Sequence, residues 1–347
     1  MEMMASHACA SGRASTFRRK VSGMRTKQLG YTDLQFSVIG LGSFAIGGSG
    51  WKFSWGPQDD EDSIRAVVRG VELGVNWIDT APVYGLGHSE EVVGAALKRC
   101  SRKPRIATKC GRRWDGDGNI YSRMRKASVR EEAEASLRRL GVDVIDLYQI
   151  HWPQPEEEFE EGWDAMAQLV REGKVRYLGV SNFSVEQMKR VQVIHPIASL
   201  QPPYSMLRRE IESEILPFCA QHRIGVIPYS PMQKGLLTGK FSVERMKSLP
   251  PDDHRRNDPM FAEPQLGANL QLIRGLEGLA REHRMTVAEL ALAWVLRRPE
   301  VTSAIVGARR PEQIEETADA ATKTLSPELI QAVEELLAQR DKSLAAR

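Results

Sequence analysis

The segment Trp77-Ile78-Asp79-Thr80-Ala81-Pro82-Val83-Tyr84-Gly85 decides how the rest of the chain is interpreted. A short apolar run ends in the carboxylate of Asp79, a proline marks a turn, and Tyr84 follows just beyond it. This order is typical of a strand that delivers an ionisable group to the mouth of a pocket. An acid at a strand end can also cap the next helix, so the segment alone does not establish a site. Its meaning changes because two similar strand ends follow downstream, at Lys109 and at His151.

Strand-like runs alternate with amphipathic helical patterns along most of the chain. The helices are indicated by apolar residues at three- and four-residue spacing. The strands are rich in Val, Ile and Leu, as expected for parallel strands buried on both faces. The expected strands are Val38–Gly42, Val75–Asp79, Arg105–Lys109, Val144–Ile150, Val175–Val180, Ala198–Gln201, Gly225–Tyr229 and Thr302–Val306. This rhythm predicts an α/β fold, a (β/α)8 TIM barrel, whose active site lies at the C-terminal ends of its strands.

The prediction includes segments that are not part of the regular repeat. A long loop, Ser230–Gly267, follows the seventh strand, and extra helices complete the C-terminal part. Loops of this length in a compact domain are usually functional or mobile. We expect one barrel domain over residues 24–347. Residues 1–23 are basic and rich in serine and alanine, and we expect a disordered extension there, with an amphipathic transit peptide as the alternative.

Composition excludes several classes of function. The chain has 347 residues, 41% of them hydrophobic, and a net charge of +3 that comes from the first 27 residues. The rest is near neutral, so we expect no nucleic-acid partner. No apolar run reaches the roughly 18 residues of a membrane span. The four cysteines lack disulfide-like spacing, which favours a reducing, cytoplasmic location. The seven histidines show no metal-ligand spacing, so no metal site is predicted.

In the predicted barrel, Asp79, Lys109 and His151 follow strands two, three and four and meet Tyr84 at one face. Tyrosine has an ordinary pKa near 10, and a nearby ammonium such as that of Lys109 is expected to lower it. Asp79 would keep the lysine charged and oriented, and His151 would hydrogen-bond a substrate oxygen. A site that donates a proton to an oxygen while stabilising negative charge suits carbonyl reduction, with hydride from a cofactor.

These motifs resemble those of the aldo-keto reductases, from about Leu29 to the C-terminal helix. Asp79-Thr80-Ala81-x-x-Tyr84-Gly85 is similar to the family's Asp–Tyr element, and Lys109 and His151 complete its tetrad. The segment from Gly173 to Phe183 is a further matching element. The resemblance implies NADPH/NADP+ as cofactor, a small-molecule aldehyde or ketone as substrate, and Tyr84 as the acid that protonates its oxygen.

The resemblance also implies a set of cofactor-binding residues. Ser181, Asn182 and Gln201 match positions that hold the nicotinamide carboxamide, and Tyr229 matches the aromatic residue on which the ring stacks. The loop from Gly235 to Lys240 is similar to one that closes over the pyrophosphate. The full expected set is Gly42, Ser43, Ser181, Asn182, Gln201, Tyr229, Ser230, Pro231, Gly235, Leu236, Lys240, Gly307, Arg309, Arg310, Gln313 and Glu316.

The adenosine end departs from the pattern of the mammalian members. Gly307 stands where those members often have lysine, and Gln313 where they have arginine. The chain is more similar to the microbial and potassium-channel-β-subunit-like branch, in which Arg309 or Arg310 would contact the 2′-phosphate.

Aromatic residues on loops at the mouth are the expected lining of the substrate pocket: Trp51, Phe53, Trp55, Trp114 and Trp152. They do not specify a substrate. Two alternatives to physiological carbonyl reduction stay open: the same chemistry run as alcohol oxidation with NADP+, and a cofactor-binding regulatory subunit. The chain is expected to be a monomer or a homo-oligomer.

Overall fold

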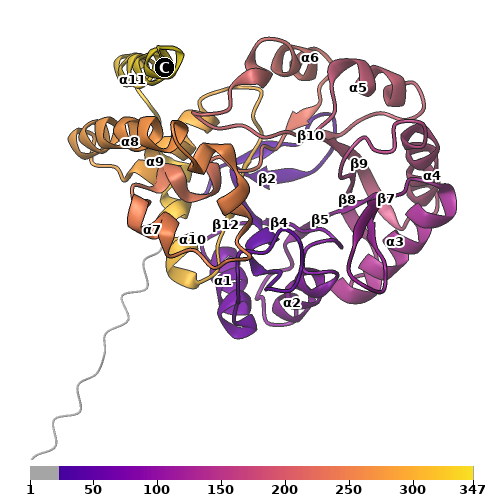
Figure 1. The fold of residues 1–347 in the computed structure, drawn as a ribbon. Coiled ribbons are helices and arrows are strands. Elements are labelled where there is room, and N and C mark those ends of the chain that lie inside the picture. The colour runs from indigo at the N-terminus through magenta and orange to yellow at the C-terminus, as the bar shows by residue number, and fades with distance from the viewer. Residues whose placement is uncertain (1–22, 347) are drawn as a thin grey trace, which may run out of the picture.

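The computed structural model describes residues 23–346. The extension predicted for residues 1–23 therefore lies, except for Gly23, outside the described residues. In the described part, eight parallel strands form one curled sheet in the order β11-β10-β9-β8-β5-β4-β3-β12 (Figure 1). The strands are β3 (Ile39–Gly42), β4 (Trp77–Asp79), β5 (Arg105–Cys110), β8 (Ile145–Ile150), β9 (Val175–Ser181), β10 (Ser199–Gln201), β11 (Gly225–Val226) and β12 (Ala304–Gly307).

The two edge strands meet and close the sheet into a barrel. A parallel bridge joins Val226 to Val301, and the Thr302 N–H donates to the Val226 carbonyl at 2.8 Å. Strand β11 is shorter than the predicted Gly225–Tyr229 because Pro228 has no N–H to donate to a ladder. Its carbonyl still accepts the N–H of Ile305 at 2.9 Å. The predicted (β/α)8 barrel is confirmed.

Helices surround the barrel between successive strands (Figure 1). They are α1 (Asp60–Glu72), α2 (His88–Leu97), α3 (Lys126–Leu140), α4 (Phe159–Arg171), α5 (Val185–Gln192), α6 (Ile215–Gln221), α9 (Val287–Leu296) and α10 (Pro311–Ala318). Their apolar faces pack on the sheet and form one continuous core. The apolar spacing in the sequence predicts helices over Phe159–Arg171 and Val287–Leu296, and α4 and α9 have these bounds. None of the helices in the described part is long and apolar enough to cross a membrane.

The predicted long loop after the seventh strand contains short helical turns. It holds α7 (Val243–Lys247) and the 3-10 turns η3 (Gln233–Thr238), η4 (His254–Asn257) and η5 (Pro259–Phe261). Two further helices, α8 (Gln265–Glu282) and α11 (Pro327–Ala345), pack against each other beside the barrel. A short 3-10 turn also precedes α6, at η2 (Glu210–Glu212), and others follow β3, at η1 (Phe44–Ile46), and α10, at η6 (Asp319–Thr322).

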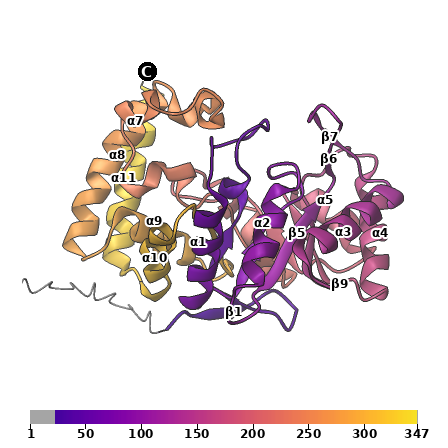
Figure 2. The same cartoon turned by 90° about the horizontal axis from the view of Figure 1, so that it is seen from below.

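A hairpin that the sequence analysis did not predict fills one end of the barrel. Strands β1 (Thr26–Gln28) and β2 (Gln35–Ser37) pair antiparallel. Phe36 on this hairpin stacks on Trp77 inside the barrel, with ring centroids 4.5 Å apart and planes at 10°. The Trp77 ring lies so close to Gly40 that a Cβ there would approach it to 2.2 Å, which explains the glycine. Figure 2 shows β1 at the end of the barrel opposite to the mouth.

A second unpredicted hairpin stands at the mouth. Strands β6 (Arg112–Trp114) and β7 (Ile120–Ser122) follow directly after β5 and pair antiparallel. Figure 2 shows this hairpin and α7 projecting on the side of the barrel away from β1. The hairpin therefore rises beside the site that the strand ends build.

Candidate active site

Lys109, Asp79 and Tyr84 form one buried hydrogen-bonded group at the C-terminal ends of β4 and β5. The Lys109 ammonium donates to Asp79 Oδ2 at 2.7 Å, to the Thr80 carbonyl at 2.9 Å and to Tyr84 Oη at 3.1 Å. Three acceptors match the three N–H bonds of an ammonium, so each of its hydrogens has a partner. The lysine side chain is fully buried. The predicted contact of the acid, the lysine and the phenol is present in the structure.

Burial raises the pKa of Tyr84 well above its ordinary value, and the Asp79 carboxylate raises it further. The lowered pKa predicted from the sequence is therefore wrong. The cost of placing a phenolate in a buried site outweighs the attraction of the Lys109 charge. Burial likewise lowers the pKa of Lys109, and the neighbouring Asp79 opposes that effect. Tyr84 is consequently a protonated phenol at neutral pH.

His151 completes the group from the end of β8. Its ring lies edge-on to the Tyr84 ring, with centroids 5.6 Å apart. Burial, followed by the charges of Lys109 and Arg112, holds the pKa of His151 well below its ordinary value, so the imidazole is neutral. Its Nδ1 atom is buried and has no hydrogen-bond partner among the described residues. A neutral imidazole with free hydrogen-bonding capacity can contact an uncharged carbonyl oxygen.

Two glutamines hold the second oxygen of Asp79. Gln201 Nε2 donates to Asp79 Oδ1 at 2.8 Å, and Gln149 Nε2 lies 3.4 Å from the same atom. Both glutamines are buried. The carboxylate is thus oriented by donors on both oxygens, which is the support that a precisely placed catalytic group requires. Gln149 was not among the residues predicted for the site.

Polar side chains at the ends of β9 and β10 form the adjoining wall. Ser181 Oγ donates to the Gln201 carbonyl at 2.9 Å, and Asn182 Nδ2 donates to the His151 carbonyl at 3.1 Å. The Tyr229 hydroxyl donates to Asn182 Oδ1 at 2.9 Å. Ser181 and Asn182 do not cap α5, since Ser184 makes that capping box with Gln187. These side chains are therefore free to serve the site rather than the helix.

One cavity of about 680 Å³ connects the tetrad with the outer loops. Most of the predicted residues line it. They are Gly42, Trp51, Phe53, Trp55, Asp79, Tyr84, His151, Trp152, Ser181, Asn182, Gln201, Tyr229, Ser230, Pro231, Gly235, Lys240, Gly307, Arg310, Gln313 and Glu316. Lys109 lies behind Asp79 and Tyr84 rather than at the surface of the cavity.

Three predicted cofactor residues turn their side chains elsewhere. Leu236 is fully buried in the core. Ser43 Oγ accepts a hydrogen bond from Ser89 at 2.7 Å and is buried. The Arg309 guanidinium donates to the carbonyls of Trp55 and Pro57 and to the side chain of Gln58. Arg309 therefore fastens the segment 55–58, whereas Arg310 faces the cavity.

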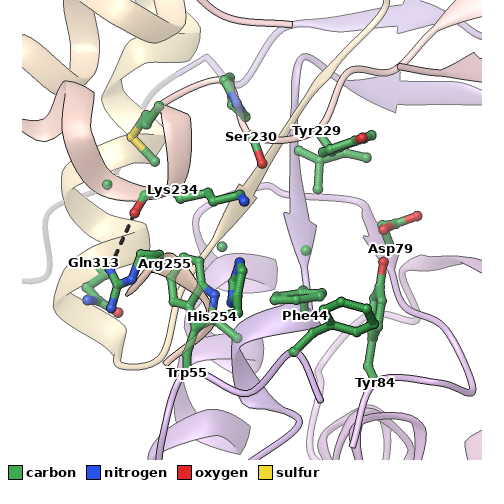
Figure 3. Close-up of a pocket in the computed structure, with 18 of the residues that line it drawn as sticks. Phe44, Trp55, Asp79, Tyr84, Tyr229, Ser230, Lys234, His254, Arg255 and Gln313 are labelled. Atoms are coloured by element: carbon green, nitrogen blue, oxygen red, sulfur yellow. Dashed lines mark hydrogen bonds between the residues drawn. The ribbon is translucent and has the colours of Figure 1, made fainter. Parts of the chain in front are cut away.

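Two of the tryptophans predicted for the substrate pocket differ in their relation to the cavity. Trp114 does not line the cavity, because it lies further along β6, paired with Ile120 toward the tip of the hairpin. Trp55 lines the cavity but lies away from the tetrad, with Phe44 between it and Tyr84 (Figure 3). The Phe44 ring centroid is 6.1 Å from that of Trp55 and 5.0 Å from that of Tyr84.

The long loop after β11 covers the end of the cavity that contains Trp55. His254 stacks on the Trp55 ring, and the Arg255 guanidinium lies 4.5 Å from its centroid (Figure 3). Lys234 binds Asp258 at 2.6 Å. Phe44, Lys234, His254 and Arg255 were not predicted, because loop residues carry no periodic pattern. Phe44 could have been suspected from its place just after Gly42 and Ser43.

The cavity contains polar groups and open space that could hold a nicotinamide dinucleotide. The Trp55 indole N–H is buried and has no hydrogen-bond partner among the described residues. It could therefore donate to an acceptor on a ligand bound near the long loop. Gly307 leaves open space at the end of β12, where a Cβ would meet nothing closer than 4.0 Å. Arg310, at the start of α10, adds a cation at a helix N-terminus, which favours phosphate. The part of the chain that the structure describes contains no metal-ligand cluster.

Comparisons with known proteins agree with this geometry. A family model described as "Aldo/keto reductase family" matches residues 38–338. The aldo-keto reductase YhdN of Bacillus subtilis is 38% identical over 300 residues, 86% of this chain and 88% of that protein. A protein of Escherichia coli named NADH-specific methylglyoxal reductase is 34% identical over 317 residues, 87% of this chain and 95% of that protein.

Solved structures show the same similarity. The glycerol dehydrogenase AKR11B4 of Gluconobacter oxydans superposes with a TM-score of 0.84 at 40% identity, covering 91% of this chain and 96% of that one. The holo form of the aldo-keto reductase AKR11C1 of Bacillus halodurans superposes with a TM-score of 0.76 at 28% identity, covering 90% and 96%.

Proposed function

The chain belongs to the aldo/keto reductase family, and we propose that it reduces an aldehyde or ketone to an alcohol with NADPH as the preferred cofactor. The observation that carries this proposal is the buried contact of Lys109 with both Asp79 and Tyr84, beside the neutral imidazole of His151. This arrangement holds a proton next to a cavity and surrounds it with groups that stabilise the anion left after its transfer.

Tyr84 is the proton donor in the proposed reaction. Its oxygen accepts a hydrogen bond from Lys109, and within the described part of the chain it donates to no side chain. The phenol hydrogen is thus available to a carbonyl oxygen in the cavity. As the proton moves to that oxygen, the negative charge on Tyr84 Oη develops 3.1 Å from an ammonium that is already in place. Preorganised charge of this kind lowers the barrier without a reorganisation cost.

His151 and the polar wall position the reactants. The neutral imidazole can hydrogen-bond the carbonyl oxygen and hold it near Tyr84 Oη. Ser181, Asn182 and Gln201 would hold the carboxamide of the cofactor, and Tyr229 would lie against its ring. When bound, the reduced nicotinamide supplies a hydride to the carbonyl carbon. Carbon and oxygen then each gain one hydrogen, and the product is the alcohol.

Alcohol oxidation with NADP+ is the second candidate function. It is favoured by the similarity to a structure named as a glycerol dehydrogenase. The same residues would act in reverse, and Tyr84 would then accept the proton. We keep reduction first because burial holds Tyr84 in the protonated form that donates. The buried tetrad also supports an enzyme over a regulatory subunit, and we place the enzyme in the cytoplasm.

An assay of the wild-type protein and Tyr84→Phe tests the proposal. A panel of aldehydes and ketones is followed by loss of NADPH or NADH absorbance, and the alcohols with NADP+ or NAD+. We expect turnover by the wild-type protein and a fall of about 10²- to 10⁴-fold in kcat for Tyr84→Phe, since the phenol is the acid. Cofactor binding, measured by fluorescence titration, should persist in the variant.

Tyr121→Phe is the matched control, because Tyr121 lies exposed on β7 and its hydroxyl serves no part of the tetrad. It should turn over at the wild-type rate. Wild-type turnover by Tyr84→Phe would contradict the assignment of the proton donor, and absence of any carbonyl-dependent cofactor oxidation would contradict the function itself.

A further inference from the structure

Arg112 places a positive charge in the wall of the cavity that contains the tetrad. It is the first residue of β6 and lines the same cavity as Tyr84, His151 and Trp152. Its Cζ atom lies 5.8 Å from the centroid of the Trp152 ring. The charge acts on the tetrad, because Arg112 is one of the causes that lower the pKa of His151. The guanidinium therefore belongs to the wall that a bound carbonyl compound would face.

The hydrogen bonds of Arg112 leave much of its capacity unused. Nη1 donates to Ser122 Oγ at 2.9 Å, and Nη2 lies 3.4 Å from Gln154 Oε1. Both partners are neutral. A guanidinium is a planar fork with further N–H donors, and that fork matches the two oxygens of a carboxylate or phosphate. The bond to Ser122 fixes the direction of the fork and leaves donors for a ligand.

No carboxylate among the described residues forms an ion pair with Arg112. Three other cations in or beside the cavity do have such partners: Lys109 with Asp79 at 2.7 Å, Lys234 with Asp258 at 2.6 Å and Arg255 with Asp253 at 2.6 Å. Arg245 and Arg310 also line the cavity, and like Arg112 they form no ion pair among the described residues. The next residue, Arg113, turns away from the cavity and binds Glu131 at 3.0 Å. Burial lowers the pKa of Arg112, and no acidic partner opposes that effect. An arginine nevertheless remains charged at neutral pH. Because no described carboxylate pairs with Arg112, its charge has no counterion in the described part of the chain.

We propose that Arg112 recognises an oxyanion on the substrate, so that the preferred substrates are aldehydes or ketones that carry a carboxylate or a phosphate. This inference rests on the proposed carbonyl reduction. Apolar residues of the same cavity, Trp51 beside Tyr84, Trp152 beside Arg112, and Ile120, suit a carbon chain between the two polar ends. A charged, bidentate contact in a half-buried site is worth much more than one in open water.

A purely structural role for Arg112 gives a different expectation. In that case the arginine would serve only to hold β6 against β7 through Ser122. Removing the Ser122 hydroxyl would then have the same effect as removing the guanidinium, and both changes would affect all substrates equally. Recognition of an oxyanion instead requires the guanidinium and changes only substrates that carry one.

Matched substrate pairs test the inference in the full-length protein with saturating cofactor. One pair is 4-oxobutanoate and butanal, which differ by a carboxylate. The other is glyceraldehyde 3-phosphate and glyceraldehyde, which differ by a phosphate. The measured quantity is the ratio of kcat/KM for the anionic member to that for the neutral member. The proteins are wild type, Arg112→Met, Arg112→Lys, Ser122→Ala and the control Arg113→Met.

We expect the wild-type ratio to exceed one for at least one pair and to fall about 10- to 100-fold in Arg112→Met, mainly through KM. Arg112→Lys should restore part of the ratio, while Ser122→Ala and Arg113→Met should keep most of it. The pair that responds identifies the oxyanion. A wild-type ratio at or below one for both pairs, or equal ratios in wild type and Arg112→Met, would overturn the inference while leaving carbonyl reduction intact. Absence of turnover with every substrate would overturn both.

Discussion

Arg309 and Arg310 are neighbours in the chain with different surroundings, and they should affect cofactor binding differently. Arg309 donates to the segment 55–58, whereas Arg310 lines the cavity and has no ion-pair partner among the described residues. We expect Arg310→Ala to raise the Kd of NADPH about tenfold, since a charge-assisted contact with the 2′-phosphate is lost. The Kd of NADH, which lacks that phosphate, should change little.

Fluorescence titration of both cofactors with wild type, Arg310→Ala and Arg309→Ala would measure this difference. Arg309→Ala should weaken both cofactors to a similar extent, because it loosens a loop rather than removing a phosphate contact. An equal loss of NADPH and NADH affinity in Arg310→Ala would show that this arginine does not contact the 2′-phosphate of NADPH. Because one relative, from E. coli, is named as NADH-specific, family membership alone does not give the cofactor preference, and this measurement is needed to determine it.

Single residues were predictable where a strand end fixes the position. Asp79, Lys109 and His151 follow strands whose ends meet in a barrel, so their proximity follows from the fold. Trp114 was assigned to the pocket by residue type, and Arg112, two positions earlier, was missed. Both lie on a short hairpin whose direction the sequence does not determine. The pKa of Tyr84 was wrong in direction because burial is a property of the folded chain.

At the scale of single elements, the β1–β2 hairpin should make a large contribution to stability. Phe36 is fully buried and stacks on Trp77 inside the barrel. Phe36→Ala should destabilise the protein by about 3–5 kcal/mol, because a large aromatic side chain leaves a cavity between well-packed rings. The melting temperature by differential scanning calorimetry would show the loss.

Phe53→Ala is a suitable control for Phe36→Ala, since Phe53 is 40% exposed at the opposite end of the barrel. It should change the melting temperature only slightly. A similar loss of stability in both variants would mean that the hairpin does not contribute more than an ordinary loop contact.

The elements that the sequence predicted and those it missed differ in length. The apolar spacing in α4 and α9 extends over several turns, and it predicts the first and last residues of both helices correctly. The strands of both hairpins have three residues each, too few for an alternating pattern to appear. The β6–β7 turn did carry a signal in Asp115-Gly116-Asp117-Gly118, since aspartate and glycine favour tight turns. In the structure, Asp115 Oδ1 accepts the N–H groups of Asp117 and Asn119.

At the scale of the whole molecule, Glu132 should make stability depend on pH. Burial raises the pKa of Glu132 from 4.5 to about 8, although the Gly111 N–H and the charges of Arg113 and Arg139 oppose the shift. Between about pH 4.5 and pH 8, the folded chain keeps a proton on Glu132 that the unfolded chain has released. The stabilising contribution is therefore complete below about pH 4.5 and is lost as pH rises toward 8.

Glu132→Gln removes this titration while keeping an acceptor for the Gly111 N–H. We expect the melting temperature of the variant, relative to wild type, to rise between pH 5 and 8 and then to level off. Glu134→Gln on the same helix is the control, because Glu134 pairs with Lys174 and its pKa is lowered. A constant difference between Glu132→Gln and wild type across this range would contradict the raised pKa.

The fold of the whole molecule was the most predictable property. Eight strand–helix units repeat in order, and parallel strands joined in this way close into a barrel with one defined functional end. The sequence did not show what fills the other end, because the β1–β2 hairpin precedes the repeat and shares none of its pattern.

The β1–β2 hairpin also has a consequence for the order in which ligands bind and leave. Since β1 and β2 fill one end of the barrel, the mouth beside β6–β7 and the long loop serves both ligands in the described part of the chain. The residues expected to hold the nicotinamide lie at the strand ends, deeper than the loops expected to hold the substrate. Two molecules that share one entrance at different depths cannot exchange independently. Turnover is therefore expected to follow a compulsory order, in which the cofactor binds first and leaves last.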